Sequence, residues 1–128
     1  MYAAALAIGL ATAITPAPAP GADVPVRLVI SRAHVHPGDV QSWSLKCAPT
    51  GGSHPAAEKA CAMLRAIRGD LDKIRPRPGL VCTTEHDPYD VRIRGVYDGR
   101  PVVFAQRYAN GCVLEGSAAP IVPHDGPR

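Results

Sequence analysis

Four cysteines offer the clearest chemistry in this chain of 128 residues. Cys47, Cys61, Cys82 and Cys112 include no pair separated by only two residues, whereas structural zinc sites generally use such close pairs. The spacing therefore favours two disulfides over a metal site, and disulfides persist in oxidising compartments such as the extracellular space. Four cysteines allow three pairings, of which the sequential one, Cys47–Cys61 and Cys82–Cys112, is the most economical.

Candidate catalytic groups are few. Thr84, His86 and Asp87 supply the hydroxyl, imidazole and carboxylate of a hydrolase triad, but they are almost adjacent in the chain. Because triads are assembled from separated segments whose side chains converge, we predict that the chain is not an enzyme and has no catalytic residue. His54 stands beside Pro55, where a helix is expected to begin, and we interpret it as a capping or packing residue.

Metal and nucleic-acid binding are also disfavoured. His34 and His36 could present two imidazoles on one side of a strand, but no further ligand accompanies them, so we expect a surface role beside a turn. Lys73, Arg75 and Arg77 form a small basic cluster in a chain of net charge +3 with 5% aromatic residues. Nucleic-acid binding requires wider basic coverage and stacking aromatics. We therefore predict no cofactor, no metal and no nucleic-acid partner.

The first 22 residues have the composition of a targeting segment. They contain no charged side chain, and their apolar run from Tyr2 to Ile14 is shorter than the roughly 20 residues that cross a bilayer as a helix. Its length matches the apolar region of a secretory signal, although the basic residues that normally precede that region are missing. We predict a signal peptide over residues 1–22, cleaved after Ala22 or Ala13, and no membrane partner. The alternative is a disordered Ala/Pro leader. Residues 23–128 suit a single domain with a frayed C-terminal tail.

Sequence periodicity indicates the elements that must position these residues. Apolar residues alternate over 24–30 and 43–47, which predicts two strands joined through a turn at 36–39. Helical spacing over 57–67 predicts one main helix that begins at Pro55 and ends at Gly69. Strict alternation over 89–93, the turn pair Asp98-Gly99 and a returning strand over 102–108 predict a β-hairpin.

The order of these elements is typical of an α+β fold. Residues 81–88 are expected to be irregular, and residues 119–122 are expected to form a short last strand. We predict an antiparallel β-sheet of about five strands with one main α-helix packed on one face, stabilised by two disulfides.

Three stretches of the sequence form a pattern of motifs. They are Cys47-Ala48-Pro49 with Gly52-Ser53-His54-Pro55-Ala56-Ala57 and Ala60-Cys61-Ala62; then Gly69-Asp70-Leu71; then Cys82, Asp87-Pro88, Gly95-Val96, Gly99 and Cys112. The first stretch is the most specific, and together they span about residues 26–122. This pattern resembles the Streptomyces subtilisin inhibitor family of secreted serine protease inhibitors.

The resemblance implies sequential disulfides, an antiparallel sheet with a helix packed on it, and often a homodimer. It also implies reversible, tight inhibition of an extracellular serine protease, chiefly a subtilisin-like one, by an exposed loop that enters the protease cleft as a substrate would. By position, the reactive bond of the family falls two residues after the third cysteine, at Thr84–Glu85. The loop that would contact the protease comprises Val81, Cys82 and Thr83 before this bond and His86, Asp87 and Pro88 after it.

This sequence departs from the family at the reactive bond itself. Typical members place Met, Lys or another long residue where Thr84 stands, and each missing methylene in an apolar pocket costs about 0.8 kcal/mol. Glu85 adds a charge beside the attacked carbonyl. These changes favour a protease with a small primary pocket, such as an elastase-like one.

A charged sheet face opposes the homodimer that the resemblance implies. Asp90, Arg92 and Arg94 alternate with apolar residues and therefore share one face of the predicted hairpin. Two further readings stay open. The chain could be a non-inhibitory extracellular binding or structural module on the same scaffold, or a substrate of a secreted enzyme such as a transglutaminase, through Gln41 or Gln106.

Overall fold

Four strands, two α-helices and one short 3-10 helix make up the described part of the chain. The computed structural model describes residues 4, 5, 7–14 and 24–124. The α+β class, the hairpin and the main helix are confirmed, and none of the described helices is long and apolar enough to cross a membrane. In chain order the elements are β1 (Val26–His34), β2 (Val40–Cys47), α1 (Ala57–Ala66), η1 (Leu71–Lys73), β3 (Tyr89–Tyr97), β4 (Arg100–Tyr108) and α2 (Gly111–Ala118).

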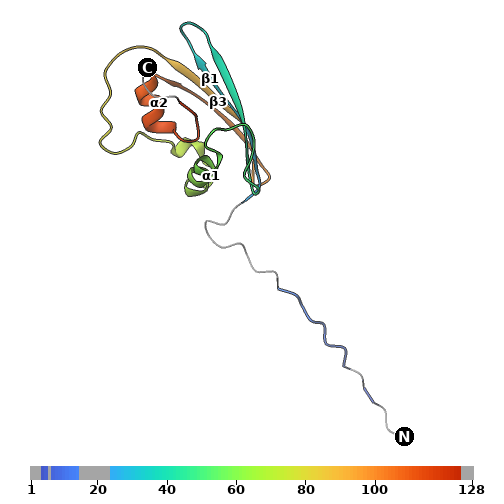
Figure 1. Ribbon diagram of the computed structural model, residues 1–128. Coiled ribbons are helices and arrows are strands. Elements are labelled where there is room, and N and C mark those ends of the chain that lie inside the picture. Colours follow the sequence, from blue (N-terminus) through green and yellow to red (C-terminus); the bar gives the residue numbers. More distant parts are fainter. Residues whose placement is uncertain (1–3, 6, 15–23, 125–128) are drawn as a thin grey trace.

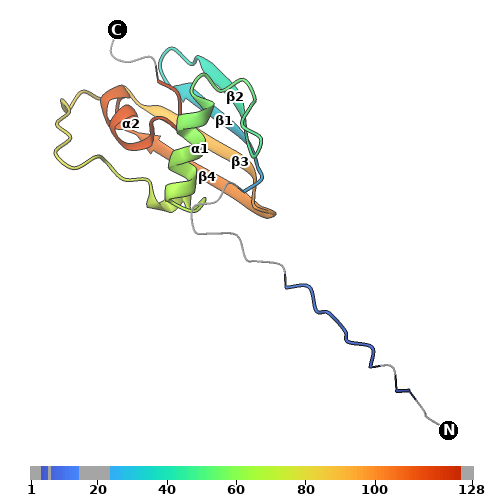
Figure 2. The same ribbon diagram turned by 60° about the horizontal axis from the view of Figure 1, so that its bottom comes forward.

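The four strands form one antiparallel sheet with the order β2-β1-β3-β4. β1 pairs with β2 on one side and with β3 on the other, and β3 continues into β4 through the predicted turn at Asp98 and Gly99. These turn residues have positive φ angles of 48° and 76°, as a type I′ hairpin requires. Figures 1 and 2 show both helices on the same side of the sheet, so its other face is left without a helix.

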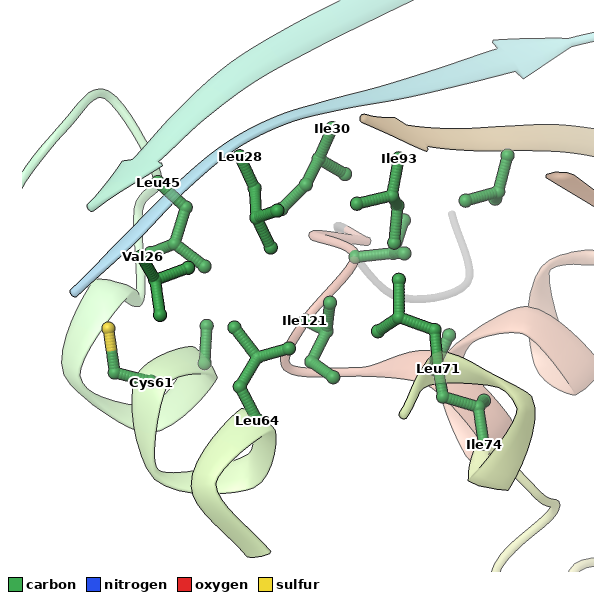
Figure 3. Packing of buried hydrophobic residues seen from close by; sticks show 14 of the residues in the cluster. Val26, Leu28, Ile30, Leu45, Cys61, Leu64, Leu71, Ile74, Ile93 and Ile121 are labelled. Atoms are coloured by element: carbon green, nitrogen blue, oxygen red, sulfur yellow. The ribbon is translucent and has the colours of Figure 1, made fainter. Parts of the chain in front are cut away.

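The core lies between the sheet and the segments that cover it. Figure 3 shows Leu28 and Ile30 of β1 and Ile93 of β3 pointing from the sheet toward Leu64 of α1 and toward Ile121. All five side chains are at most 3% exposed. Each buried side chain of this size contributes about 1.5–3 kcal/mol to stability, so a small domain relies on such layers.

Two disulfides connect the helices to the rest of the fold. Cys47 at the end of β2 is bonded to Cys61 in α1, and Cys82 is bonded to Cys112 in α2. The sequential pairing is therefore confirmed. The two bonds close segments of 14 and 30 residues, respectively.

The main helix begins two residues later than predicted. α1 starts at Ala57 rather than Pro55, because the backbone of Ala56 has a φ of −134°, which is not helical. His54 organises this start: its Nδ1 accepts a hydrogen bond from the N–H of Ala56 at 3.0 Å, and its Nε2 lies 2.9 Å from the carbonyl oxygen of Ile121. The imidazole is buried, so the predicted packing role is confirmed, whereas no side chain caps the N-terminus of α1.

The chain after β4 differs from the prediction. Residues 119–122 do not form a strand, and the described sheet has four strands rather than about five. Instead, α2 follows β4, and Ile121 and Val122 are fully buried in the core. Pro123 is also buried, and its carbonyl accepts a hydrogen bond from Arg32. Apolar packing, rather than strand pairing, therefore fixes this segment.

The predicted signal peptide falls largely outside the described residues. Residues 1–3, 6 and 15–23 are not among them, and they include the predicted cleavage position after Ala22. Residues 125–128 of the predicted frayed tail are also outside the described part. Residues 4, 5 and 7–14 form no helix or strand. The signal peptide and the domain boundary stay predictions.

The open face of the sheet is basic. The strand register places Lys46 of β2 opposite Arg27 of β1. On the other side, Arg27 lies opposite Val96 of β3, and Arg94 is the next residue of β3 on the same face. Asp90, by contrast, is paired with Arg107, whose Nε and Nη2 donate to its two carboxylate oxygens at 2.7 and 2.9 Å. These hydrogen bonds lower the pKa of Asp90. The predicted charged face is confirmed, and within the described residues Arg27, Lys46 and Arg94 form no ion pair on it.

Candidate functional site

Residues 81–88 form an exposed, irregular loop, as predicted. Figures 1 and 2 show it as part of the long yellow stretch between η1 and β3 that extends away from the sheet and helices. The side chain of Val81 is 89% exposed, and Thr83, Thr84, Glu85 and His86 are exposed as well. Both residues of the predicted reactive bond are therefore accessible to a partner.

The loop is tied to α2 where it begins. The Cys82–Cys112 disulfide fastens it two residues before Thr84. Upstream, the N–H of Arg77 donates to the carbonyl of Gly116 at 2.9 Å. Gly116 also leaves room for the side chain of Leu80, since a Cβ there would lie 2.5 Å from it. The entry to the loop is thus held by one covalent bond and by backbone packing.

The loop is tied to the sheet where it ends. The N–H of Asp87 donates to the carbonyl of Ala109 at 2.9 Å, and the carbonyl of Pro88 accepts from the N–H of Val35 at 3.0 Å. Pro88 is fully buried. The Asp87 carboxylate lies 2.8 Å from Nε2 of His34, so the side chain of this loop residue is anchored too.

One side chain braces the loop on both sides of the predicted bond. Nδ2 of Asn110 donates to the carbonyl of Thr83 at 3.2 Å and to the carbonyl of Glu85 at 2.8 Å. Its Oδ1 accepts from the N–H of Val113 at 3.0 Å, which caps α2. Asn110 is only 5% exposed. A rigid helix terminus therefore fixes the backbone on either side of Thr84.

Sequence reasoning located the loop but missed the residues that support it. Asn110 received no predicted role, although Asn is a favoured helix N-cap and stands three residues before Val113. His34 was expected in a surface role, yet it stacks on Tyr89 with ring centroids 4.4 Å apart and pairs with Asp87. Nothing in the sequence indicates the His34–Asp87 pair, because the two residues are 53 positions apart.

Two titratable side chains of the loop, Glu85 and His86, are exposed, whereas the nearby Tyr108 is buried. The carboxylate of Glu85 and the imidazole of His86 are exposed and form no hydrogen bond within the described residues. Tyr108, at the end of β4, is buried, and this burial raises the pKa of its phenol. The exposed groups can meet a partner, whereas the phenol belongs to the fold.

The loop residues are not assembled for catalysis. Thr84, His86 and Asp87 are not hydrogen-bonded to one another within the described part of the chain, and Asp87 is paired with His34 instead. The described residues also contain no group of three or more His, Cys, Asp or Glu side chains arranged to hold a metal ion. The loop therefore offers a shape and a backbone to a partner rather than a reacting group.

Known proteins show the same pattern. A family model described as "Subtilisin inhibitor-like" matches residues 24–110. "Subtilisin inhibitor-like protein 1" of Streptomyces cacaoi is 41% identical over 103 residues, which cover 76% of this chain and 94% of the relative. "Subtilase-type protease inhibitor" of Streptomyces coelicolor is 35% identical over 117 residues, which cover 87% and 81%, respectively.

A solved structure agrees with these matches. Streptomyces caespitosus sermetstatin, in complex with Bacillus licheniformis subtilisin, has a TM-score of 0.62 to this chain at 32% identity. The match covers 73% of this chain and 91% of that one. The resemblance that the motifs indicated is thereby confirmed. The chain belongs to the subtilisin inhibitor-like family, which consists of protease inhibitors and not of enzymes.

Proposed function

We propose that this chain is a secreted, tight-binding and reversible inhibitor of a subtilisin-like serine protease, and that Thr84–Glu85 is its reactive bond. The observation that carries this proposal is the bracing of an exposed loop on both sides of that bond by Asn110. Ordering a flexible peptide on binding costs free energy, and a loop that is already held in place avoids much of that cost.

The same bracing explains how a substrate-like loop would inhibit rather than be consumed. If the protease hydrolyses the bond, the new end at Thr84 stays tethered through the Cys82–Cys112 disulfide. The new end at Glu85 stays tethered through the hydrogen bond to Asn110 and the buried Pro88. Because both ends remain near their original positions, religation competes with release. The protease performs the chemistry, and this chain supplies the geometry.

The residues at the bond define the protease that fits. Thr84 is short and β-branched, so it fills a small primary pocket better than a large apolar one. Glu85 carries an exposed carboxylate on the leaving side, which favours a protease with a basic or neutral surface there. We therefore place the target among secreted subtilisin-like proteases with a restricted primary pocket. An elastase-like protease shares that pocket type.

Extracellular action is supported by two features. The apolar segment before residue 23 has the length of a secretory signal region, and both disulfides suit an oxidising compartment. We propose that the basic side chains of the open sheet face weaken a sheet-on-sheet homodimer, although Val29, Val96 and Val103 on the same face are exposed. Stacking two copies through this face would bring Lys46, Arg27 and Arg94 of each copy against like charges. Sedimentation equilibrium tests this, and a salt-independent dimer would contradict it.

The experiment that tests the inhibitor proposal is a set of inhibition constants against a subtilisin, an elastase-like and a trypsin-like protease. Each is measured for the unaltered protein, for Thr84→Met, and for Thr50→Met as a control, since Thr50 is exposed on a different loop. We expect Thr84→Met to tighten binding to subtilisin by roughly tenfold, because about two methylenes enter its large pocket. Identical constants for all three proteins would contradict the assignment of Thr84.

A further inference from the structure

The face of the sheet opposite the helices carries the chain's excess of positive charge. The strand register gives this outer face five exposed cations and one half-buried carboxylate, which are Arg27, Lys46, Arg92, Arg94, Arg107 and Asp90. The face therefore has a formal net charge of +4, whereas the whole chain has +3. Because the remaining residues have no net positive charge, the positive field of the molecule is concentrated on this one face.

Four of these cations form a continuous basic track across three strands. Lys46 of β2 lies directly opposite Arg27 of β1. Arg94 of β3 is the diagonal neighbour of Arg27, since Arg27 lies opposite Val96. Arg92 is the next residue of β3 on the same face. Opposite residues are about 5 Å apart, whereas diagonal neighbours and successive residues on one face of a strand are about 7 Å apart. The basic track is therefore about 20 Å long.

The protein does not neutralise the basic track. Within the described residues, Arg27, Lys46 and Arg94 form no ion pair. The carboxylate of the face, Asp90, is bonded to Arg107 at 2.7 and 2.9 Å. Like charges directly opposite each other in a sheet are destabilising, so the Lys46–Arg27 pair weakens the fold. Such a local conflict is expected where side chains serve binding rather than stability.

The outer face of the sheet has no aromatic side chain. The register places Trp43, Phe104 and the three strand tyrosines on the inner face. Protein interfaces are enriched in aromatic residues, membrane interfaces in Trp and Tyr, and single-stranded nucleic acids bind where their bases can stack on rings. A face with arginines and no rings instead suits phosphate groups, because a guanidinium can donate two parallel hydrogen bonds to one phosphate.

We propose that the outer face of the sheet binds a linear, phosphate-bearing polymer whose chain follows the basic track from Lys46 to Arg92. A linear polymer matches the linear order of the charges, and each phosphate that meets a cation releases counterions condensed on the polymer.

The polymer leaves the loop at 81–88 free. This loop is bonded to α2 through Cys82–Cys112, and Figures 1 and 2 show α2 on the other side of the sheet. Binding of the polymer does not depend on the proposed protease inhibition. If both proposals hold, a phosphate-rich polymer can retain the inhibitor while the loop occupies a protease.

The test measures binding of the oxidised protein to linear inorganic polyphosphate by isothermal titration calorimetry at several salt concentrations. We expect saturable binding at about 50 mM NaCl. The logarithm of the binding constant should fall with the logarithm of the salt concentration with a slope of about −3, since about four phosphates are neutralised on a flexible chain. Orthophosphate at the same phosphate concentration should not bind measurably, because it meets only one cation at a time.

Matched charge variants separate the basic track from the net charge. Arg27→Gln with Arg94→Gln removes two charges from the track, and should weaken binding about tenfold or more and halve the salt slope. Arg68→Gln with Arg77→Gln removes two exposed arginines outside the sheet, and should change the binding constant by less than about twofold. Lys46→Gln should weaken binding but keep or raise the melting temperature, because it removes the like-charge pair with Arg27.

The proposal is overturned if the two double variants bind polyphosphate equally well, or if binding does not saturate up to about 1 mM phosphate. It is also overturned by tighter binding to poly-glutamate, to single-stranded DNA or to phosphatidylglycerol vesicles at equal charge concentration. The occupant would then be an acidic peptide, a nucleic acid or a membrane. A dimer of the unaltered protein that polyphosphate does not dissociate would overturn it too, because a second copy would then cover the face.

Discussion

Asn110 joins the fold to the proposed reactive loop, and replacing it should damage both. The side chain makes one capping bond to α2 and two bonds to loop carbonyls. Removing an N-cap costs about 1 kcal/mol, and each of the other two hydrogen bonds is worth about 1 kcal/mol. Asn110→Ala should therefore lower the free energy of unfolding by about 3 kcal/mol. Asn110→Ser retains a capping oxygen, so it should cost only about 2 kcal/mol.

Urea unfolding followed by tryptophan fluorescence measures both changes. With a denaturant slope of about 2 kcal/mol per molar, the midpoint should fall by about 1.5 M for Asn110→Ala and about 1 M for Asn110→Ser. In parallel, the Thr84–Glu85 bond of Asn110→Ser should be hydrolysed faster by subtilisin, because the amide no longer holds the carbonyls of Thr83 and Glu85. If Asn110→Ser matches the unaltered protein in midpoint and in hydrolysis rate, the bracing argument is refuted.

Three further changes test the account of the fold. Replacing both Cys82 and Cys112 by alanine should cost about 4 kcal/mol in urea unfolding, since the disulfide closes a segment of 30 residues. Burial raises the pKa of Tyr108 above its ordinary value. The neutral phenol therefore contributes stability that is complete below about pH 10 and is lost as the pH rises through the raised value. Tyr108→Phe should flatten the alkaline decline of the unfolding midpoint above about pH 10, and an unchanged decline would contradict this. Gly95→Ala should destabilise by more than about 3 kcal/mol or prevent folding, because its Cβ would lie 1.9 Å from the carbonyl oxygen of Arg27; a normal melting temperature would contradict it.

Sequence periodicity was enough to predict the elements with strong local signals. The Asp98-Gly99 pair sets the hairpin, because both positions need positive φ angles that these residues tolerate. The face of α1 that contains Ala60, Cys61 and Leu64 is buried as its spacing indicates. Such features depend on residues close together in the chain, which is the information that periodicity carries.

The elements that the sequence did not predict depend on tertiary contacts. α2 has only eight residues and includes Gly111 and Gly116, so it shows no clear apolar period. Ile121 and Val122 have a composition typical of a strand. In the structure they pack into the core and pair with no strand among the described residues. The irregular conformation of residues 81–88 was predicted from local sequence, whereas Asn110 supports this loop from 25 and 27 residues away.

The central claim is that the Thr84–Glu85 bond occupies the protease active site and survives there. It is tested most directly by incubating the protein with a catalytic amount of subtilisin and mapping the cleaved bonds by mass spectrometry over time. The account predicts one slow cut, between Thr84 and Glu85, with both fragments still joined through Cys82–Cys112 and the cut protein still inhibitory. Rapid cutting at another bond, or loss of inhibition as soon as this bond is cut, would contradict it.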